Sequence, residues 1–250
     1  MRLELGERDR PVVVFTVGGR YDYLYETLES WSKVRGVENA TMVFLVEPEH
    51  PTEMMLCHQW ARDMAALALV SENRTRLGVS GNPWHAMQTG FRLADFVILA
   101  EEDTPVSSDV LEYFAWARDA YLGDGNVKAV CAHQIGEPLG AEGDVLRSKH
   151  FSPVVWGTWR DRWVSFFRDS WGGPQGWDSQ VNKLLRAKDY RQVVIPARSR
   201  SQHIGEHGGA HCIPEFFPRT VSRSWSASYG PQAYRELDRV QQQEGKWRDK

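Results

Sequence analysis

Short runs of apolar residues alternate with helix-like patterns through the first half of this 250-residue chain. This alternation constrains the fold more than any other feature. Continuous apolar runs of this length are typical of strands that are buried on both faces. Strands that alternate with helices favour a mostly parallel sheet with helices on both sides, so we predict a single α/β domain. The expected strands span residues 11–17, 41–46, 77–79, 96–99 and 127–132.

The helices between these strands are predicted from apolar residues at helical spacing, and the second half of the chain is less regular. A tryptophan-rich stretch at 156–171 is expected to be helical, and the three glycines of 198–209 indicate a mobile loop. We expect a domain at 1–220, with halves 1–130 and 131–220, and a tail at 221–250. The other expected elements are helices at 22–34, 52–69, 83–93, 110–121 and 177–187, a strand at 192–195 and a polar surface helix at 232–243.

Three acidic residues, Glu101, Glu102 and Asp103, directly follow the apolar run at 96–99. Open α/β sheets bind ligands at the carboxyl ends of their strands. Neighbouring carboxylates repel one another unless a cation neutralises them, and Mg²⁺ or Mn²⁺ prefers hard oxygen ligands and usually brings a phosphate with it. The run therefore indicates a metal–diphosphate site. The alternative is an acidic turn in which Asp103 or Ser107 only caps the helix at 110–121.

Two further charged residues follow predicted strands at the same edge of the sheet. Arg20 comes after Gly18 and Gly19 at the end of the first strand, and Glu47 ends the second strand. The glycines match neither the dinucleotide-binding pattern nor the P-loop pattern, so those two classes have no support. Arg20 could contact a phosphate or a base, or could be an ordinary surface residue. The convergence of Arg20, Glu47 and the three acids on one edge is stronger evidence for a ligand site than any one of these residues.

An acid beside an indole, Trp177-Asp178, begins the helix predicted at 177–187. An indole can stack on a sugar ring while a neighbouring carboxylate deprotonates a hydroxyl nucleophile. The alternative is that Asp178 only caps the helix.

Three histidines with a spacing of four, His203, His207 and His211, lie in the glycine-rich loop. The glycines argue against a helix, and no metalloprotease or Cys/His pattern is present, so a zinc site is the weaker interpretation. A loop that carries one of these histidines to a metal or a diphosphate is the stronger one.

The charge is unevenly distributed although the net charge is only −3. Residues 1–146 hold 12 Lys and Arg against 23 Asp and Glu, and residues 147–223 hold 13 against 6. A basic segment favours an anionic ligand or partner, or it complements the acidic half of the same chain.

No apolar run is long enough to cross a membrane, and the three cysteines are widely spaced. We therefore expect a cytoplasmic protein with reduced thiols and no transmembrane segment.

The order of these motifs resembles the GT-A class of nucleotide-sugar-dependent glycosyltransferases, and specifically the inverting N-acetylglucosaminyltransferase I family. The likeness runs with gaps from about residue 11 to 217. The segment VILAEEDTPVSSDVLEYF is similar to the family's acidic motif and the helix after it, and VFTVGGRYDYLYETLESW is similar to its first strand and helix. GWDSQV is similar to its Trp-Asp motif, LRSKHFSPVVWGTWRDRW to a donor-pocket segment, and RSRSQHIGEHGGAHCIPEFF to the loop that closes over the donor.

The resemblance implies a role for each matching residue. It makes Asp103 the metal ligand for Mn²⁺ or Mg²⁺ and Asp178 the catalytic base that deprotonates the acceptor. Residues expected to contact the nucleotide-sugar donor are Arg20, Glu47, Glu101, Glu102, Trp177, Arg200 and His211. The chain departs from the family in its Glu-Glu-Asp triplet and in Ser179, which replaces a second acid.

We therefore expect a metal-dependent inverting glycosyltransferase that uses a nucleoside-diphosphate sugar, and a UDP-sugar is the expected donor. The acceptor is a hydroxyl on a glycan, lipid or protein, or on a hydroxymethylated base in DNA. A sugar nucleotidyltransferase and a non-catalytic carbohydrate-binding protein are the alternatives. The first would be expected to carry a lysine after its first strand, yet no lysine precedes Lys33; the second leaves the three acids unexplained.

Overall fold

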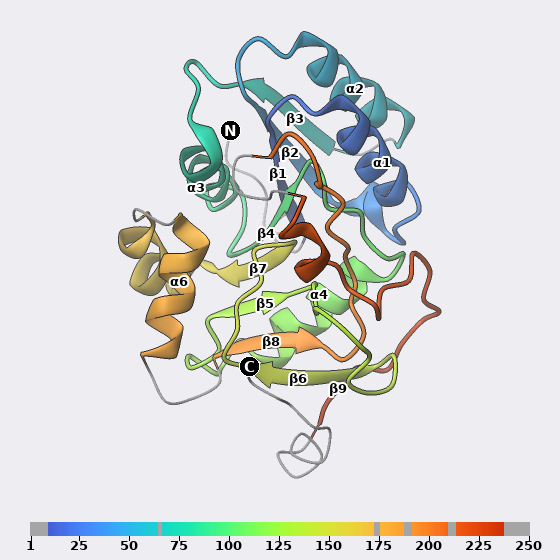
Figure 1. The fold of residues 1–250 in the computed structure, drawn as a ribbon, viewed down its shortest axis with the longest axis vertical. Coiled ribbons are helices and arrows are strands. Elements are labelled where there is room, and N and C mark those ends of the chain that lie inside the picture. The colour runs from blue at the N-terminus through green and yellow to red at the C-terminus, as the bar shows by residue number, and fades with distance from the viewer. Residues whose placement is uncertain (1–9, 65–66, 173–175, 188–191, 210–213, 238–250) are drawn as a thin grey trace.

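One mixed β-sheet runs through the middle of the molecule (Figure 1). The computed structural model describes residues 10–64, 67–172, 176–187, 192–209 and 214–237. In this part of the chain the strand order is β3-β2-β1-β4-β7-β5-β8-β6-β9. β3, β2, β1 and β4 are parallel, whereas β7 is antiparallel to both of its neighbours. The strands are β1 (Val12–Val17), β2 (Thr41–Val46), β3 (Leu67–Glu72), β4 (Phe96–Glu101), β5 (Ala129–Cys131), β6 (Asp144–Ser148), β7 (Trp156–Trp159), β8 (Val193–Pro196) and β9 (Arg235–Glu236).

Helices cover both faces of this sheet, which confirms the predicted single-domain α/β fold. α1, α2 and α4 pack on one face and α3 and α6 on the other, as Figure 1 shows for α1 and α2 against α3 and α6. The longer helices are α1 (Tyr21–Trp31), α2 (Pro51–Asp63), α3 (Gly78–Gly90), α4 (Val110–Ala120) and α6 (Trp177–Arg186). Short helical turns are η2 (Val37–Asn39), α5 (Arg160–Arg162), η3 (Trp163–Phe167), η4 (Arg168–Ser170) and η5 (Phe217–Arg219).

Alternate residues of the central strands supply the two halves of the core. In β1, Val13 and Phe15 face α1 and α2, while Val12 and Val14 face α3. Phe15 lies 5.0 Å from the ring of Phe44 on β2, in a stacked arrangement. Full burial of such side chains stabilises the fold by roughly 1.5–3 kcal/mol each. The strands are apolar on both faces because helices cover both faces.

The register of the parallel strands brings their carboxyl ends to one edge. Val17 at the end of β1 pairs with Val46 at the end of β2, and Thr16 pairs with Glu101 at the end of β4. The residues that follow these three strands therefore lie side by side. This is the edge at which the acidic residues were predicted to converge.

Two predictions in the first half are wrong. The helix expected at 52–69 ends at Asp63, and Leu67–Glu72 forms the edge strand β3 beside β2. Leucine and alanine are good helix formers, but pairing with β2 overrides that preference here. The strand expected at 77–79 is instead the start of α3, whose Gly78 has a φ of +70°.

The second half also differs from expectation. The tryptophan-rich stretch begins as strand β7 and becomes helical only from Arg160. At the C-terminal end, residues 232–234 are irregular and Arg235–Glu236 forms β9 beside β6, so the helix expected at 232–243 does not begin there. Residues 238–243 lie outside the described part of the chain. Within the described part, no helix is both long and apolar enough to span a lipid bilayer.

Candidate functional site

Glu102 organises the turn that follows β1. Its Oε2 accepts hydrogen bonds from the backbone amides of Gly18 and Gly19 at 2.7 and 3.0 Å, and from that of Arg20 at 3.3 Å. These amides belong to the turn that leads into α1, where backbone donors have no helical partner. The carboxylate is only 3% exposed. Glu102 therefore holds the glycine turn in place against the end of β4.

Arg20 joins two of the three acids. Its Nε donates to Oε1 of Glu102 at 2.6 Å, and its Nη2 lies 2.8 Å from Oδ2 of Asp103. Burial alone would lower the pKa of Arg20, but the two carboxylates outweigh burial and raise it. The structure thus brings Arg20 to the acids, as the sequence predicted.

Asp103 is almost completely buried, and one of its oxygens is unsatisfied by the described residues. Oδ2 faces Arg20 and lies 3.4 Å from Nε2 of His203, whereas Oδ1 has no hydrogen-bond partner in the part of the chain that the structure describes. Burial would raise the pKa of Asp103, but the hydrogen bond from His203 and the charge of Arg20 hold it below its usual value. A buried carboxylate oxygen without a partner is costly. An added cation would satisfy it.

His203 reaches Asp103 from the glycine-rich loop. Its other ring nitrogen, Nδ1, lies 2.8 Å from the hydroxyl of Thr220, which orients the imidazole. A Cβ atom on Gly205 would stand 1.9 Å from Oδ2 of Asp103, so only glycine allows this approach. Of the other two histidines, His207 is largely exposed and His211 lies outside the described residues. The sequence did not indicate which of the three histidines would face a metal, and the expected donor contact of His211 lies outside the described residues.

Glu101 is the third acid at this edge, and the charge of Asp178 at the start of α6 acts on it. Burial, the neighbouring charges of Asp103 and Glu102, and the charge of Asp178 raise the pKa of Glu101 to about 8, although Arg20 opposes the shift. The residue that precedes α6 as its cap is Gly176, and Asp178 makes no capping hydrogen bond. Among the described residues no hydrogen bond or ion pair engages the Asp178 carboxylate. Its oxygens therefore hold no described part of the protein in place.

A cavity of about 160 Å³ lies over this edge. Glu47 lines it, but its carboxylate accepts hydrogen bonds from the amides of Leu77 and Gly78, so Glu47 holds the start of α3. Arg76 also lines the cavity, and the sequence analysis missed it because it lies in a polar loop without a motif. The complete lining is Thr16, Gly18, Arg20, Glu47, Arg76, Gly78, Val79, Asn82, Pro83, Glu101, Glu102, Gly208 and Gly209.

Two residues expected to contact the donor are instead inside the protein. Trp177 is 5% exposed, and its ring stacks on Trp171 at 4.1 Å with an angle of 7° between the planes. Arg200 is completely buried, and its Nε donates to Oδ2 of Asp109 at 3.1 Å. Neither side chain is accessible to a ligand here, so direct donor contact by Trp177 and Arg200 is not supported.

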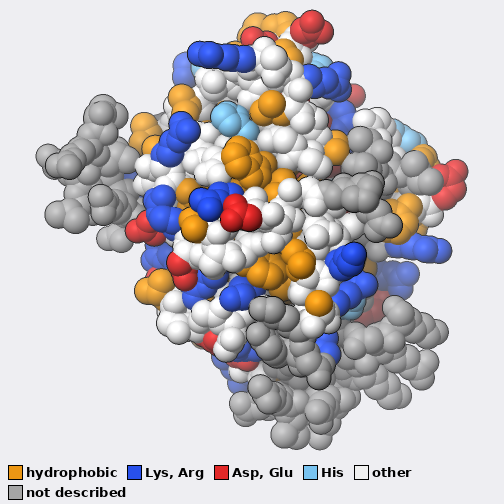
Figure 2. Space-filling model, turned by 90° about the vertical axis from the view of Figure 1, so that its left-hand side faces the viewer, with side chains coloured by type: hydrophobic (Ala, Val, Ile, Leu, Met, Phe, Trp, Pro, Cys, Tyr) orange, Lys and Arg blue, Asp and Glu red, His pale blue; other side chains and the backbone are white. Residues whose placement is uncertain are grey.

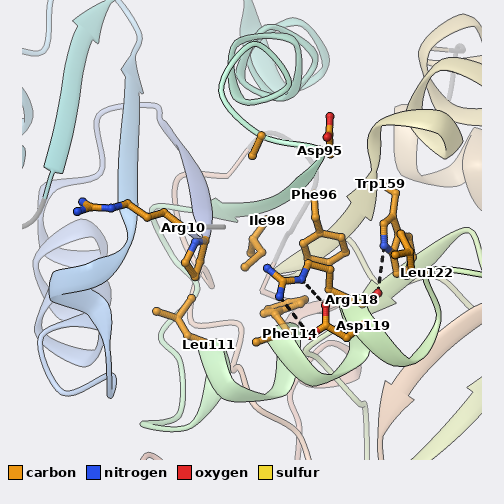
Figure 3. Close-up of a pocket in the computed structure, with 13 residues that line it drawn as sticks. Arg10, Asp95, Phe96, Ile98, Leu111, Phe114, Arg118, Asp119, Leu122 and Trp159 are labelled. Carbon is orange, nitrogen blue, oxygen red and sulfur yellow. Dashed lines mark hydrogen bonds and ion pairs between the residues drawn. The ribbon is translucent and has the colours of Figure 1, made fainter. Parts of the chain in front are cut away.

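A larger cavity lies elsewhere in the described part of the chain. It measures about 310 Å³ and lies at the opposite edge of the sheet, before β1 and β4 (Figure 3). Phe96, Ile98 and Phe114 line it, while the Arg10 side chain points away and Arg118 pairs with Asp119. No group of acids converges there. The acidic edge is therefore the better candidate site despite its smaller cavity.

The residues at the acidic edge suit a divalent cation that brings ligands with it. In the described part of the chain no three His, Cys, Asp or Glu side chains are placed to hold a metal ion together. A closed zinc site is accordingly not found there. Mg²⁺ and Mn²⁺ are commonly held by one or two protein groups plus phosphate oxygens and water. The unsatisfied Oδ1 of Asp103 fits that requirement.

Comparison with known proteins identifies solved structures with a similar fold. No family model matches the sequence, and no curated protein matches it. The structure is similar to that of S. aureus TarS 1–349 in complex with UDP-GlcNAc, with a TM-score of 0.56 and 13% identity over 79% of this chain and 60% of that chain. It is also similar to the mannosyltransferase PcManGT from Pyrobaculum calidifontis in complex with GDP-Man and Mn²⁺, with a TM-score of 0.51 and 17% identity over 75% of this chain and 56% of that chain. The chain has the GT-A fold of these glycosyltransferases.

Proposed function

We propose that this chain is a metal-dependent glycosyltransferase that moves a sugar from a nucleoside-diphosphate sugar to an acceptor hydroxyl. The observation that carries the proposal is the buried Asp103 with its unsatisfied Oδ1, beside a cavity and near the unengaged carboxylate of Asp178. The similar structures were obtained with UDP-GlcNAc and with GDP-Man and Mn²⁺, which supports a nucleotide-sugar donor. We favour a UDP-sugar.

Asp103 and His203 are the residues that would hold Mn²⁺ or Mg²⁺. Asp103 offers a buried oxygen, and the ring of His203 is oriented by Thr220 with Nε2 toward Asp103. When bound, the ion would offset the negative charge that develops on the diphosphate leaving group. Arg20 adds a fixed positive charge beside the same acids.

The reaction we propose is a single displacement at the anomeric carbon of the sugar. The acceptor oxygen forms a bond to that carbon while the bond to the diphosphate oxygen breaks, and the configuration is inverted. Asp178 takes the proton of the acceptor hydroxyl, and the nucleoside diphosphate leaves with the electron pair. The loop at 203–209 already lies against Asp103 and Arg20, and its position over the bound donor would exclude water.

The assignment to the inverting N-acetylglucosaminyltransferase I family and the cytoplasmic location are also part of the proposal, and a hydroxymethylated base in DNA is the alternative acceptor. Figure 2 shows Lys and Arg side chains spread among hydrophobic and neutral ones on the face that carries α3 and α6. Proteins that track nucleic acid usually gather such charges in a stripe, and this face shows none. We favour a glycan, lipid or protein acceptor over a hydroxymethylated base in DNA.

Thermal melting against a panel of nucleoside diphosphates, with and without Mn²⁺, tests the proposal. A ligand that binds only the folded state at a hundredfold excess over its Kd stabilises the protein by about 2.7 kcal/mol. We expect a manganese-dependent rise in Tm with UDP. Absence of a shift with every nucleotide would refute the proposal.

The product of turnover separates the two alternative functions. Release of pyrophosphate from a nucleoside triphosphate and a sugar phosphate would indicate a sugar nucleotidyltransferase. Binding of glycans without metal or turnover would indicate a carbohydrate-binding protein. Release of nucleoside diphosphate from a nucleotide-sugar is the result expected here.

A further inference from the structure

The segment Arg200–Ile204 runs beside the acidic loop in the manner of an antiparallel strand. The amide of Ile204 donates to the carbonyl of Asp103 at 3.0 Å, and the amide of Gln202 donates to that of Pro105 at 2.9 Å. The amide of Ser107 donates to the carbonyl of Arg200 at 2.9 Å. This ladder sets the position of His203 relative to Asp103. Whatever anchors the segment therefore controls the His203–Asp103 pair.

The anchor of this segment is the buried side chain of Arg200. Its Nε donates to Asp109 at 3.1 Å, its Nη1 donates to the carbonyl of Arg198 at 2.7 Å, and its Nη2 donates to the carbonyl of Glu142. Asp109 directly precedes α4, at the end of the acidic loop. One guanidinium thus ties the histidine segment to the loop that carries the three acids.

A stretch that the sequence analysis treated as a tail completes the anchor. We call residues 222–236 the C-terminal strap; in Figure 1 it runs from the centre of the molecule down its right-hand side to β9. The hydroxyl of Tyr234 donates to Oδ2 of Asp109 at 2.7 Å, and the guanidinium of Arg200 lies 4.2 Å from the ring centre of Tyr229. The side chain of Gln202 makes two hydrogen bonds to the backbone of Ser222, at 2.8 and 2.9 Å.

A buried ion pair adds little net stability, because removing the two charges from water costs free energy and well-packed apolar residues often stabilise a protein as much or more. Its directional hydrogen bonds, however, define a single register for the segments that it joins. Here the joined segments are the two that carry Asp103 and His203. The energetic cost of burying this ion pair is explained if the protein requires a fixed register between these two segments.

We propose that Arg200 is a positioning residue that acts through the segment 200–204, and that Asp109 and Tyr234 are its partners. Arg200 touches no ligand; it holds His203 against Asp103, and the strap is part of the site. The consequence for metal binding rests on the proposed function, whereas the anchoring of the segment does not. Residues that support metal ligands typically change metal affinity by about 10–100-fold when they are substituted.

The chain offers a matched control in Arg162. Like Arg200 it is buried, it donates to several backbone carbonyls, and its guanidinium lies 4.0 Å from an aromatic ring centre, that of Trp159. It belongs to α5 and makes no contact with the acidic loop among the described residues. Arg162→Lys and Arg200→Lys should therefore both lower the Tm. Tyr234→Phe removes one hydroxyl and is the mild variant if Arg200→Lys fails to fold.

Two measurements on these variants test the proposal. Amide hydrogen exchange without ligand should show lost protection at Gln202 and Ile204 in Arg200→Lys and Tyr234→Phe, but not in Arg162→Lys. Titration with UDP and Mn²⁺ should show at least about 10-fold weaker manganese-dependent binding in the same two variants and less than a twofold change in the control.

The outcomes separate the two proposals. Unchanged protection at Gln202 and Ile204 in both variants would overturn the positioning role, as would an equal loss in Arg162→Lys. If wild-type protein binds no nucleotide at all, the glycosyltransferase proposal fails, while the exchange result still decides whether Arg200 and Tyr234 anchor the segment.

Discussion

Gly205 lies so close to Asp103 that a Cβ atom in place of its hydrogen would stand 1.9 Å from Oδ2 of the carboxylate. The same atom would stand 2.9 Å from Nη1 of Arg20. The backbone of the loop therefore rests directly on the carboxylate that we assign to the metal. A side chain of any size at position 205 must displace the loop, the acid or both.

Gly205→Ala should weaken manganese-dependent binding of UDP by about 10-fold or more, because the displaced carboxylate no longer presents Oδ1 in the same place. Isothermal titration with UDP and Mn²⁺ measures the effect. Gly123→Ala is the control, because a Cβ atom there would meet nothing within 4 Å. Equal affinity for UDP in the two variants would show that the close approach has no part in ligand binding.

Asp103→Asn should remove the metal dependence of donor binding. The amide keeps the shape of the carboxylate but loses its negative charge, and Mg²⁺ and Mn²⁺ require hard, preferably anionic, oxygen ligands. The Tm measured with UDP should no longer respond to Mn²⁺ or to EDTA. A variant that still bound UDP tightly and only in the presence of Mn²⁺ would contradict the assignment of Asp103.

Asp178→Asn should separate binding from transfer. Its carboxylate makes no hydrogen bond to any residue that the structure describes, so the change should leave the Tm and the affinity for the donor near their wild-type values. Loss of a general base typically lowers kcat by about 10²–10⁴-fold. Binding by titration and turnover by release of nucleoside diphosphate provide the two readouts. Full turnover in this variant would remove Asp178 from the mechanism.

His133 gives a prediction about stability and pH. Burial and the nearby His203 lower the pKa of His133 to about 3 from an ordinary value of 6.5. The unfolded chain therefore takes up a proton below pH 6.5 that the folded chain does not, so the contribution of His133 to stability falls as the pH falls from 6.5 toward 3. At pH 5 the loss is about 2 kcal/mol.

Urea unfolding at pH 7 and pH 5 checks this prediction when His133→Asn is compared with wild type. The asparagine amide can reach the position of Nδ1, which lies 3.0 Å from the hydroxyl of Ser152. Wild type should lose about 2 kcal/mol more than the variant between the two pH values. Equal losses would mean that His133 is protonated in the folded protein as readily as in the unfolded chain.

The position of the acidic site could be predicted from the sequence because the information is local. Each of the runs at 11–17, 41–46 and 96–99 is a buried strand, and parallel strands must end at a common edge. Arg20 and the three acids lie at the ends of these strands, so the parallel arrangement alone predicts that they lie close together. The resemblance to a glycosyltransferase family agrees with the GT-A fold that the structure shows.

The errors come from contacts between segments far apart in the chain. A buried arginine and an exposed arginine look alike in sequence, and Arg200 is buried only because Asp109 and the strap surround it. Trp177 likewise lies in the core because Trp171 covers its ring. β3 forms because it pairs with β2, and this pairing overrides the helix preference of Leu67 and Ala68.

The ion pairs of Arg20 with Glu102 and Asp103 mean that the protein supplies its own counter-charge to the acids. Many small metalloproteins unfold when a chelator removes their ion, because the free energy of metal binding is part of their folding free energy. Here Arg20 already pairs with two of the three acids before any ion arrives. If the protein has the metal dependence that we propose, it would therefore stay folded in a cell short of the metal and would become active again when the metal returns, without refolding.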